Sequence, residues 1–72
     1  MTFYEWIMKY HLGTDTIIGS LAGKMYRDRM CPKDGTLKDY ERYYRQRNAG
    51  ESIIQALREA FSLYERDTGG FI

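Results

Sequence analysis

The sequence has very little of the chemistry from which catalytic and metal sites are built. It contains one cysteine, Cys31, and one histidine, His11, among 72 residues. Without clustered carboxylates these two side chains do not make a four-ligand zinc site, and no Gly-rich phosphate loop is present. A nucleophile pair of Cys31 and His11 would lack a recognisable third group to orient it. We therefore expect no catalytic residues, no metal and no cofactor: the protein is not an enzyme, and no small-molecule substrate is evident.

Long apolar runs and targeting signals are missing as well. No stretch approaches the roughly 20 apolar residues that are needed to span a bilayer. The first residues lack a basic region followed by an apolar run, so no signal peptide is evident. A single cysteine cannot form an internal disulfide, which is typical of proteins in reducing compartments. These observations predict a cytoplasmic protein with no membrane partner.

What the sequence does contain is apolar residues at helical spacing, with no alternating strand pattern. The first expected helix runs from Thr2 to Gly13, the second from Asp15 or Thr16 to Pro32, the third from Thr36 to about Arg47, and the fourth from about Glu51 or Ser52 to Asp67. Thr2 and Glu5 have the spacing of a capping box, and a proline disfavours helical angles in the residue before it. The prediction is one all-α domain over residues 1–68, a compact bundle of four short helices, followed by a short C-terminal tail at residues 69–72.

Each expected helix has an apolar face that should form the core. These faces consist of Phe3, Trp6, Ile7 and Tyr10; of Ile18, Leu21, Ala22, Met25 and Tyr26; of Leu37, Tyr40 and Tyr44; and of Ile53, Ile54, Leu57, Ala60, Phe61 and Tyr64. Cys31 suits a small buried hydrophobe, and the helix dipole favours an imidazolium at His11. Gly19 and Gly23 lie inside the second helix, where each is either a tolerated weakness or a point of close approach by a neighbouring backbone. Both interpretations stay open.

Several short motifs, taken in order, resemble a known family. They are Phe3-Tyr4, Leu21-Ala22, Asp28 with Pro32-Lys33 after it, Tyr40, and the run Leu57-Arg58-Glu59-Ala60-Phe61-Ser62-Leu63-Tyr64. Their order and spacing over residues 3–67 resemble the bacterial YozE family, which has a sterile-alpha-motif-like fold. The family usually has phenylalanine where this chain has Cys31, and often tryptophan at the position of Phe61. The resemblance implies a bundle of four short helices in a bacterial cytoplasmic protein, and fold analogy alone adds an expectation of nucleic-acid binding.

The charges are unevenly distributed along the chain. Residues 24–47 carry eight basic and four acidic side chains, while both flanks are mildly acidic. At helical spacing the third helix places three cations on one outward stripe, and the second helix points two more away from its apolar face. These five residues are Lys38, Arg42 and Arg45, with Lys24 and Arg27. If the two helices pack side by side, the five cations form one surface for nucleic-acid phosphates, with Tyr43 as a flanking base stacker.

Two other interpretations compete with this one. Glu41 and Asp39 can pair with Arg45 and Arg42 along a solvated helix, and the pI of about 7.8 is low for a nucleic-acid-binding domain. Alternatively, the basic middle and an acidic last helix could meet between copies of the chain or on a partner protein. The sequence thus predicts a small helical binding module whose partner is nucleic acid or protein, as a monomer or with weak self-association.

Overall fold

Four helices make up most of residues 1–69, the part of the chain that the computed structural model describes, and no strand occurs there. They are α1 (Phe3–Tyr10), α2 (Ile17–Arg27), α3 (Leu37–Gln46) and α4 (Glu51–Thr68). The predicted all-α bundle of four short helices is confirmed. Apart from Gly69, the predicted C-terminal tail, including Phe71 and Ile72, lies outside the described residues.

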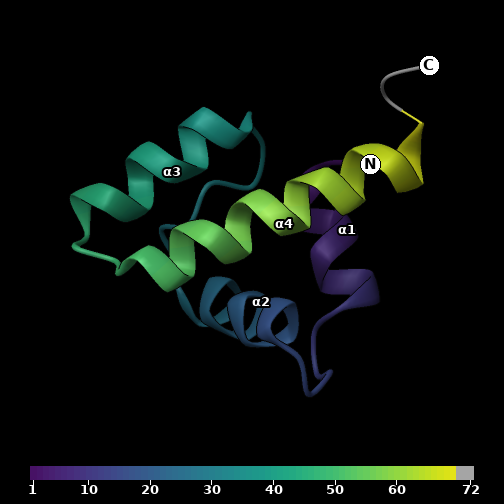
Figure 1. The fold of residues 1–72 in the computed structure, drawn as a ribbon, viewed down its shortest axis with the longest axis horizontal. Helices are drawn as coiled ribbons and strands as arrows, with labels where there is room; N and C mark the ends of the chain where they lie inside the picture. Colours follow the sequence, from purple (N-terminus) through teal and green to yellow (C-terminus); the bar gives the residue numbers. More distant parts are fainter. Residues whose placement is uncertain (70–72) are drawn as a thin grey trace.

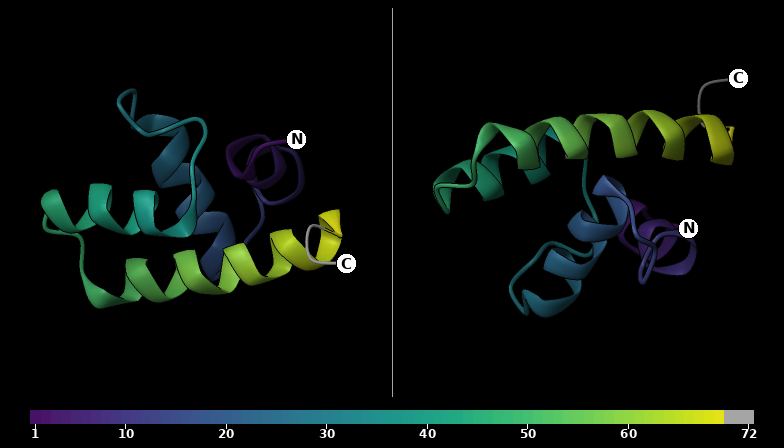
Figure 2. Two further views of the ribbon diagram at one scale, coloured as in Figure 1. Left: turned by 90° about the horizontal axis from the view of Figure 1, so that it is seen from above. Right: turned by 60° about the horizontal axis from the view of Figure 1, so that its bottom comes forward.

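The longest helix, α4, is the centre of the bundle. Each of the other three helices contacts α4, and α1 and α2 also contact each other. Helix α3 runs antiparallel beside α4, and α1 and α2 lie together on one face of this pair (Figures 1 and 2). Within residues 1–69 the backbones of α2 and α3 do not come into contact. Between the C-terminal ends of α2 and α3, contact is therefore made by side chains and loops rather than by helix backbones.

The helices begin where the sequence predicts, because their first turns are capped by local side chains. The backbone N–H of Thr2 donates to Glu5 Oε1 at 2.9 Å, and that of Glu5 donates to Thr2 Oγ1 at 3.1 Å. Thr36 and Asp39 form the same reciprocal capping box at the start of α3. Thr16 accepts from the N–H of Gly19 at 2.9 Å and so starts α2. Each bond satisfies a backbone donor that the helix leaves without a partner.

The prediction that Pro32 stops the second helix is wrong. Helix α2 already ends at Arg27, because the next residue, Asp28, adopts an extended conformation with φ −95° and ψ 100°. Its carboxylate Oδ1 accepts the backbone N–H of Met30 at 3.1 Å, a local bond that competes with continuing the helix. The chain has therefore left the helix before the proline is reached.

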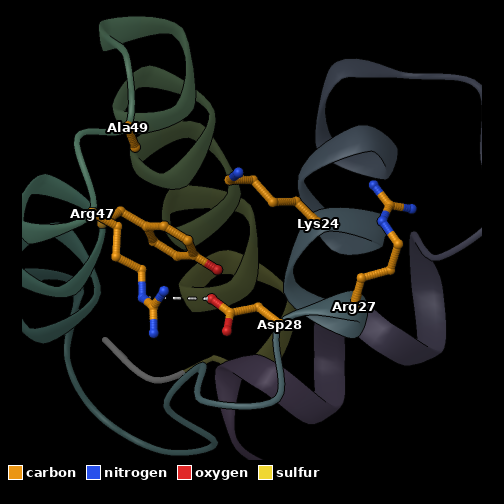
Figure 3. A pocket seen from close by; sticks show the side chains of 6 residues that line it. Lys24, Arg27, Asp28, Arg47 and Ala49 are labelled. Carbon is orange, nitrogen blue, oxygen red and sulfur yellow. Dashed lines mark ion pairs between the residues drawn. The ribbon is translucent and has the colours of Figure 1, made fainter.

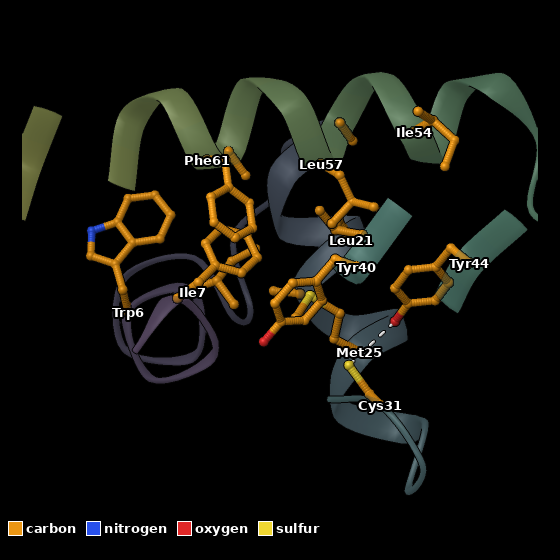
Figure 4. Close-up of a cluster of buried hydrophobic side chains, with 14 residues drawn as sticks. Trp6, Ile7, Leu21, Met25, Cys31, Tyr40, Tyr44, Ile54, Leu57 and Phe61 are labelled. Carbon is orange, nitrogen blue, oxygen red and sulfur yellow. Dashed lines mark hydrogen bonds between the residues drawn. The ribbon is translucent and has the colours of Figure 1, made fainter. Parts of the chain in front are cut away.

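The core lies where α1, α2 and α3 meet α4 (Figure 4). Its buried residues are Phe3, Trp6, Ile7, Leu21, Ala22, Met25, Cys31, Tyr40, Tyr44, Ile54, Ala56, Leu57, Ala60 and Phe61. Two predicted core residues are instead exposed, Tyr10 at 54% and Tyr26 at 64%. Tyr10 lies beside Thr68, where α4 ends, so α4 offers no further turn to cover it. Tyr26 lies on a flank of α2 that faces a surface depression rather than another helix.

The two glycines of α2 have different roles. A Cβ atom at Gly19 would overlap with the backbone carbonyl oxygen and the side-chain oxygen of Thr14, so the close-approach interpretation holds there. At Gly23 the nearest atom to such a Cβ is Nη1 of Arg27, the far end of a flexible side chain, at 3.3 Å. Packing therefore requires glycine at position 19 and does not require it at position 23.

Candidate functional site

A hollow of about 370 Å³ lies between the C-terminal end of α2 and the turn that joins α3 to α4 (Figure 3). It is lined by Lys24, Arg27, Asp28, Tyr44, Arg47 and Ala49. Three of these six side chains are cations and one is a carboxylate. We call it the cationic hollow.

The end of α3 directs Arg47 into the cationic hollow. Asn48 takes the left-handed conformation with φ 60°, and its N–H donates to the carbonyl of Arg45 at 3.1 Å. The N–H of Ala49 donates to the carbonyl of Tyr44 at 3.0 Å, which completes a Schellman motif with asparagine in the position usually held by glycine.

Arg47 is the last residue before this reversal of the chain. Its guanidinium carbon lies 4.7 Å from the centre of the Tyr43 ring, and its Nε lies 4.0 Å from Asp28 Oδ2.

Asp28 joins the end of α2 to α3. Its Oδ2 accepts a 2.7 Å hydrogen bond from the hydroxyl of Tyr43, and its Oδ1 accepts from Met30. The Tyr43 hydrogen bond is the main reason that the pKa of Asp28 lies below its ordinary value, and the charges of Arg47 and Lys24 act in the same direction. The carboxylate is therefore ionised at neutral pH, and part of its hydrogen-bonding capacity is used within the fold.

Lys24 and Arg27 supply the cations on the α2 side. Lys24 extends across the hollow toward the side of Ala49, whereas Arg27 turns along α2 (Figure 3). Both residues are exposed. Within residues 1–69 neither has a carboxylate oxygen within 4.0 Å, so their charges are not neutralised by a direct ion pair.

The structure separates the other three predicted site residues from these two. Lys38, Arg42 and Arg45 lie on α3, whose backbone does not contact α2, so the helices do not pack side by side as a single five-cation surface requires. Lys24 and Arg27 share a hollow with Arg47 instead.

The expected ion pairs along α3 are also replaced. Arg45 Nη1 lies 3.4 Å from Glu51 Oε1, at the start of α4. Glu41 pairs with Arg58 of α4 at 2.9 Å, and Asp39 bonds to Thr36 as a cap. Asp39 thus caps α3, as its spacing from Thr36 allows, whereas Glu41 joins two helices, which residue spacing within one helix does not predict.

The prediction from helical spacing and charge did not include Arg47 or Asp28 in the site. Arg47 stands at the end of the basic segment, but helical periodicity says nothing about a residue that leaves the helix. Asp28 and Tyr43 are 15 residues apart and meet only in the folded chain. Tyr43, expected as an outward stacker, is half-buried and already engages Arg47 and Asp28.

The remaining reactive side chains belong to the core or its edge. Cys31 is buried as predicted, with its Sγ 3.4 Å from the carbonyl of Pro32 and accepting from the hydroxyl of Tyr44 at 3.5 Å. Burial raises the pKa of the Cys31 thiol. The ring of His11 lies 4.8 Å from that of Trp6. Residues 1–69 contain no group of three His, Cys, Asp or Glu side chains that could hold a metal ion.

No helix in the described part of the chain has both the length and the apolar character to cross a membrane. In comparisons with known proteins, the model of one family, described as the YozE SAM-like fold, matches residues 2–66. No curated protein and no solved structure shows a significant match to the chain.

Proposed function

The chain belongs to the YozE SAM-like fold family, and on that premise we propose that it is a nucleic-acid-binding module whose cationic hollow contacts backbone phosphates. The family gives the fold and no ligand, so the proposal depends on the site itself. The observation that carries it is that Lys24 and Arg47 line one hollow from two separate parts of the chain, with Arg27 at its edge. The proposed role is binding rather than catalysis.

The local charge balance favours the cationic hollow over the α3 stripe. The hollow sets three cations against one carboxylate, and that carboxylate already accepts bonds from Tyr43 and Met30. Lys38, Arg42 and Arg45 share their surroundings with the carboxylates of Asp39, Glu41 and Glu51, so that even with Arg58, which pairs with Glu41, four cations meet three carboxylates there. An approaching phosphate would therefore meet a stronger positive potential at the hollow, which raises both affinity and association rate.

Salt dependence tests the proposal. Three phosphate contacts to a single strand predict that the logarithm of the binding constant falls against the logarithm of salt concentration with a slope of about −2. A fourfold rise in salt should then weaken binding about sixteenfold. The measurement is fluorescence anisotropy of labelled single- and double-stranded DNA and RNA titrated with the protein. Absence of binding to all four at low salt would contradict the proposal.

A second candidate, association between copies of the chain, has one observation of its own. Three large apolar side chains of α2 and the loop after it are exposed, namely Ile17 at 69%, Tyr26 at 64% and Met30 at 72%. Exposed apolar side chains at one end of an element favour a protein contact there, and Tyr26 and Met30 lie at or just after the end of α2. Ile17, nine residues before Tyr26, lies on the opposite face of α2. Light scattering over a range of protein concentrations distinguishes the two candidates, because a constant monomer mass would dispose of self-association.

A further inference from the structure

A second depression, of about 670 Å³, lies between α2 and the loop before it. The residues that matter for its chemistry are Leu12, Asp15, Gly19, Gly23, Tyr26 and Arg27. Asp15, its only carboxylate, belongs to the loop before α2, whereas Arg27 is the last residue of that helix. Its charge therefore changes from negative at the loop to positive at the end of α2. We call it the glycine groove.

Two glycines of α2 line the glycine groove, and packing requires only one of them. Gly19 is needed because of its contact with Thr14, whereas the guanidinium of Arg27 lies over Gly23, with its Nη1 3.3 Å from the place that a Cβ would take. The groove at Gly23 is therefore covered by a planar cation at the end of a flexible side chain. Tyr26, three residues further on, follows Gly23 on the same flank of the helix and is 64% exposed.

Arg27 lines both depressions, so the glycine groove and the cationic hollow meet at one side chain. A ligand that follows this path meets phosphate-binding cations first, at Lys24 and Arg47, and then an aromatic face beside an arginine. A nucleic-acid strand with unpaired bases presents matching groups, because anionic phosphates and flat aromatic bases alternate along it. In a duplex the bases stack on one another and cannot reach a tyrosine on a helix surface.

We propose that the protein binds single-stranded nucleic acid along this path, with phosphates at the cationic hollow and one base stacked on Tyr26 beside the Arg27 guanidinium. The inference rests on the proposed function and adds to it the class of strand and an aromatic contact. The aromatic contact is independent of the charge argument, because it follows from the exposure of Tyr26 in the glycine groove.

The test compares three variants by fluorescence anisotropy on a labelled single-stranded oligonucleotide and on its duplex. Tyr26→Ala should weaken single-strand binding at least fivefold, since a stacked base contributes about 1–3 kcal/mol. Tyr26→Phe keeps the ring and should bind like the wild type. Tyr10→Ala is the matched control, because Tyr10 is also exposed, at 54%, and lies on α1 outside both depressions. Because Tyr26 and Tyr10 are both exposed, circular dichroism should show all three variants folded.

The outcomes separate this inference from the proposed function. Unchanged single-strand affinity in Tyr26→Ala, or wild-type protein that prefers the duplex, would overturn the single-strand path and leave phosphate binding at the hollow intact. An equal loss in Tyr10→Ala would also overturn it, because the effect would then not be local to the glycine groove. If the wild type binds neither probe at low salt, the proposed function fails and this inference fails with it.

Discussion

At the scale of single residues, the tyrosines show how far residue type and spacing can predict a role. Tyr40 and Tyr44 are buried as their helical spacing predicts, and both hydroxyls have partners: the carbonyl of Pro32 at 2.9 Å and Cys31 Sγ at 3.5 Å. Burial raises the pKa of both phenols, so they stay neutral in the core. Tyr10 and Tyr26 also lie at positions that helical spacing assigns to an apolar face, yet both are exposed. Periodicity identifies the face of a helix but not how far the neighbouring helix extends over it.

The glycines of α2 give a prediction at this scale. Gly19→Ala should destabilise the protein by about 1–3 kcal/mol, since its Cβ would force Thr14 and the loop before α2 to move. Gly23→Ala is the matched control and should stabilise it by about 0.5–1 kcal/mol, because alanine is the better helix former and only the Arg27 side chain must shift. Urea denaturation measures both. Equal effects of the two substitutions would contradict the distinction.

At the scale of elements, local sequence signals predict where the helices begin. The end of α2 and the ion pairs between helices depend instead on contacts between residues that are distant in the sequence. The capping boxes of α1 and α3 consist of residues three apart, so a reader of the sequence can find them. The end of α2 depends on Asp28, whose carboxylate is held by Tyr43 of α3. The pairs Glu41–Arg58 and Arg45–Glu51 likewise join α3 to α4. Helix order alone does not say which of several nearby charges will meet.

The bond between Asp28 and Tyr43 predicts a response to acid. The folded-state pKa of Asp28 lies below its ordinary value of 3.8, so its contribution to stability is present above that value and is lost as pH falls through the folded pKa. Tyr43→Phe removes the main cause of the shift. The variant should be less stable than the wild type at pH 7, by about 1 kcal/mol, and the difference should shrink as pH falls below 4.

Tyr64→Phe is the control for this experiment. The hydroxyl of Tyr64 donates at 2.7 Å to the carbonyl of Met1, which does not titrate. Its loss should therefore lower stability by an amount that does not depend on pH between 7 and 3. Urea denaturation at several pH values provides both curves. A constant difference between Tyr43→Phe and the wild type across that range would contradict the role assigned to Asp28.

At the scale of the whole molecule, the arrangement of helices decides which charges act together. The sequence identified a basic middle and assigned five of its cations to one surface. The fold keeps α2 and α3 apart, so Lys24 and Arg27 line one hollow with Arg47, while Lys38, Arg42 and Arg45 remain on α3. A binding role for the α3 residues stays a prediction. The net charge of +1 indicates neither the cations of the hollow nor those of α3. Positive potential becomes concentrated at one surface only through the placement of these side chains in the fold.

The most direct test of the central claim compares two triple variants that remove the same charge. One combines Lys24→Ala, Arg27→Ala and Arg47→Ala, and the other combines Lys38→Ala, Arg42→Ala and Arg45→Ala. Fluorescence anisotropy on one labelled single-stranded oligonucleotide at low salt should show at least about a tenfold loss of affinity and a flatter salt dependence for the first variant. The second should stay within about threefold of the wild type, as expected for long-range charge alone. Equal losses in the two variants, or a larger loss in the second, would contradict the assignment of phosphate binding to the cationic hollow.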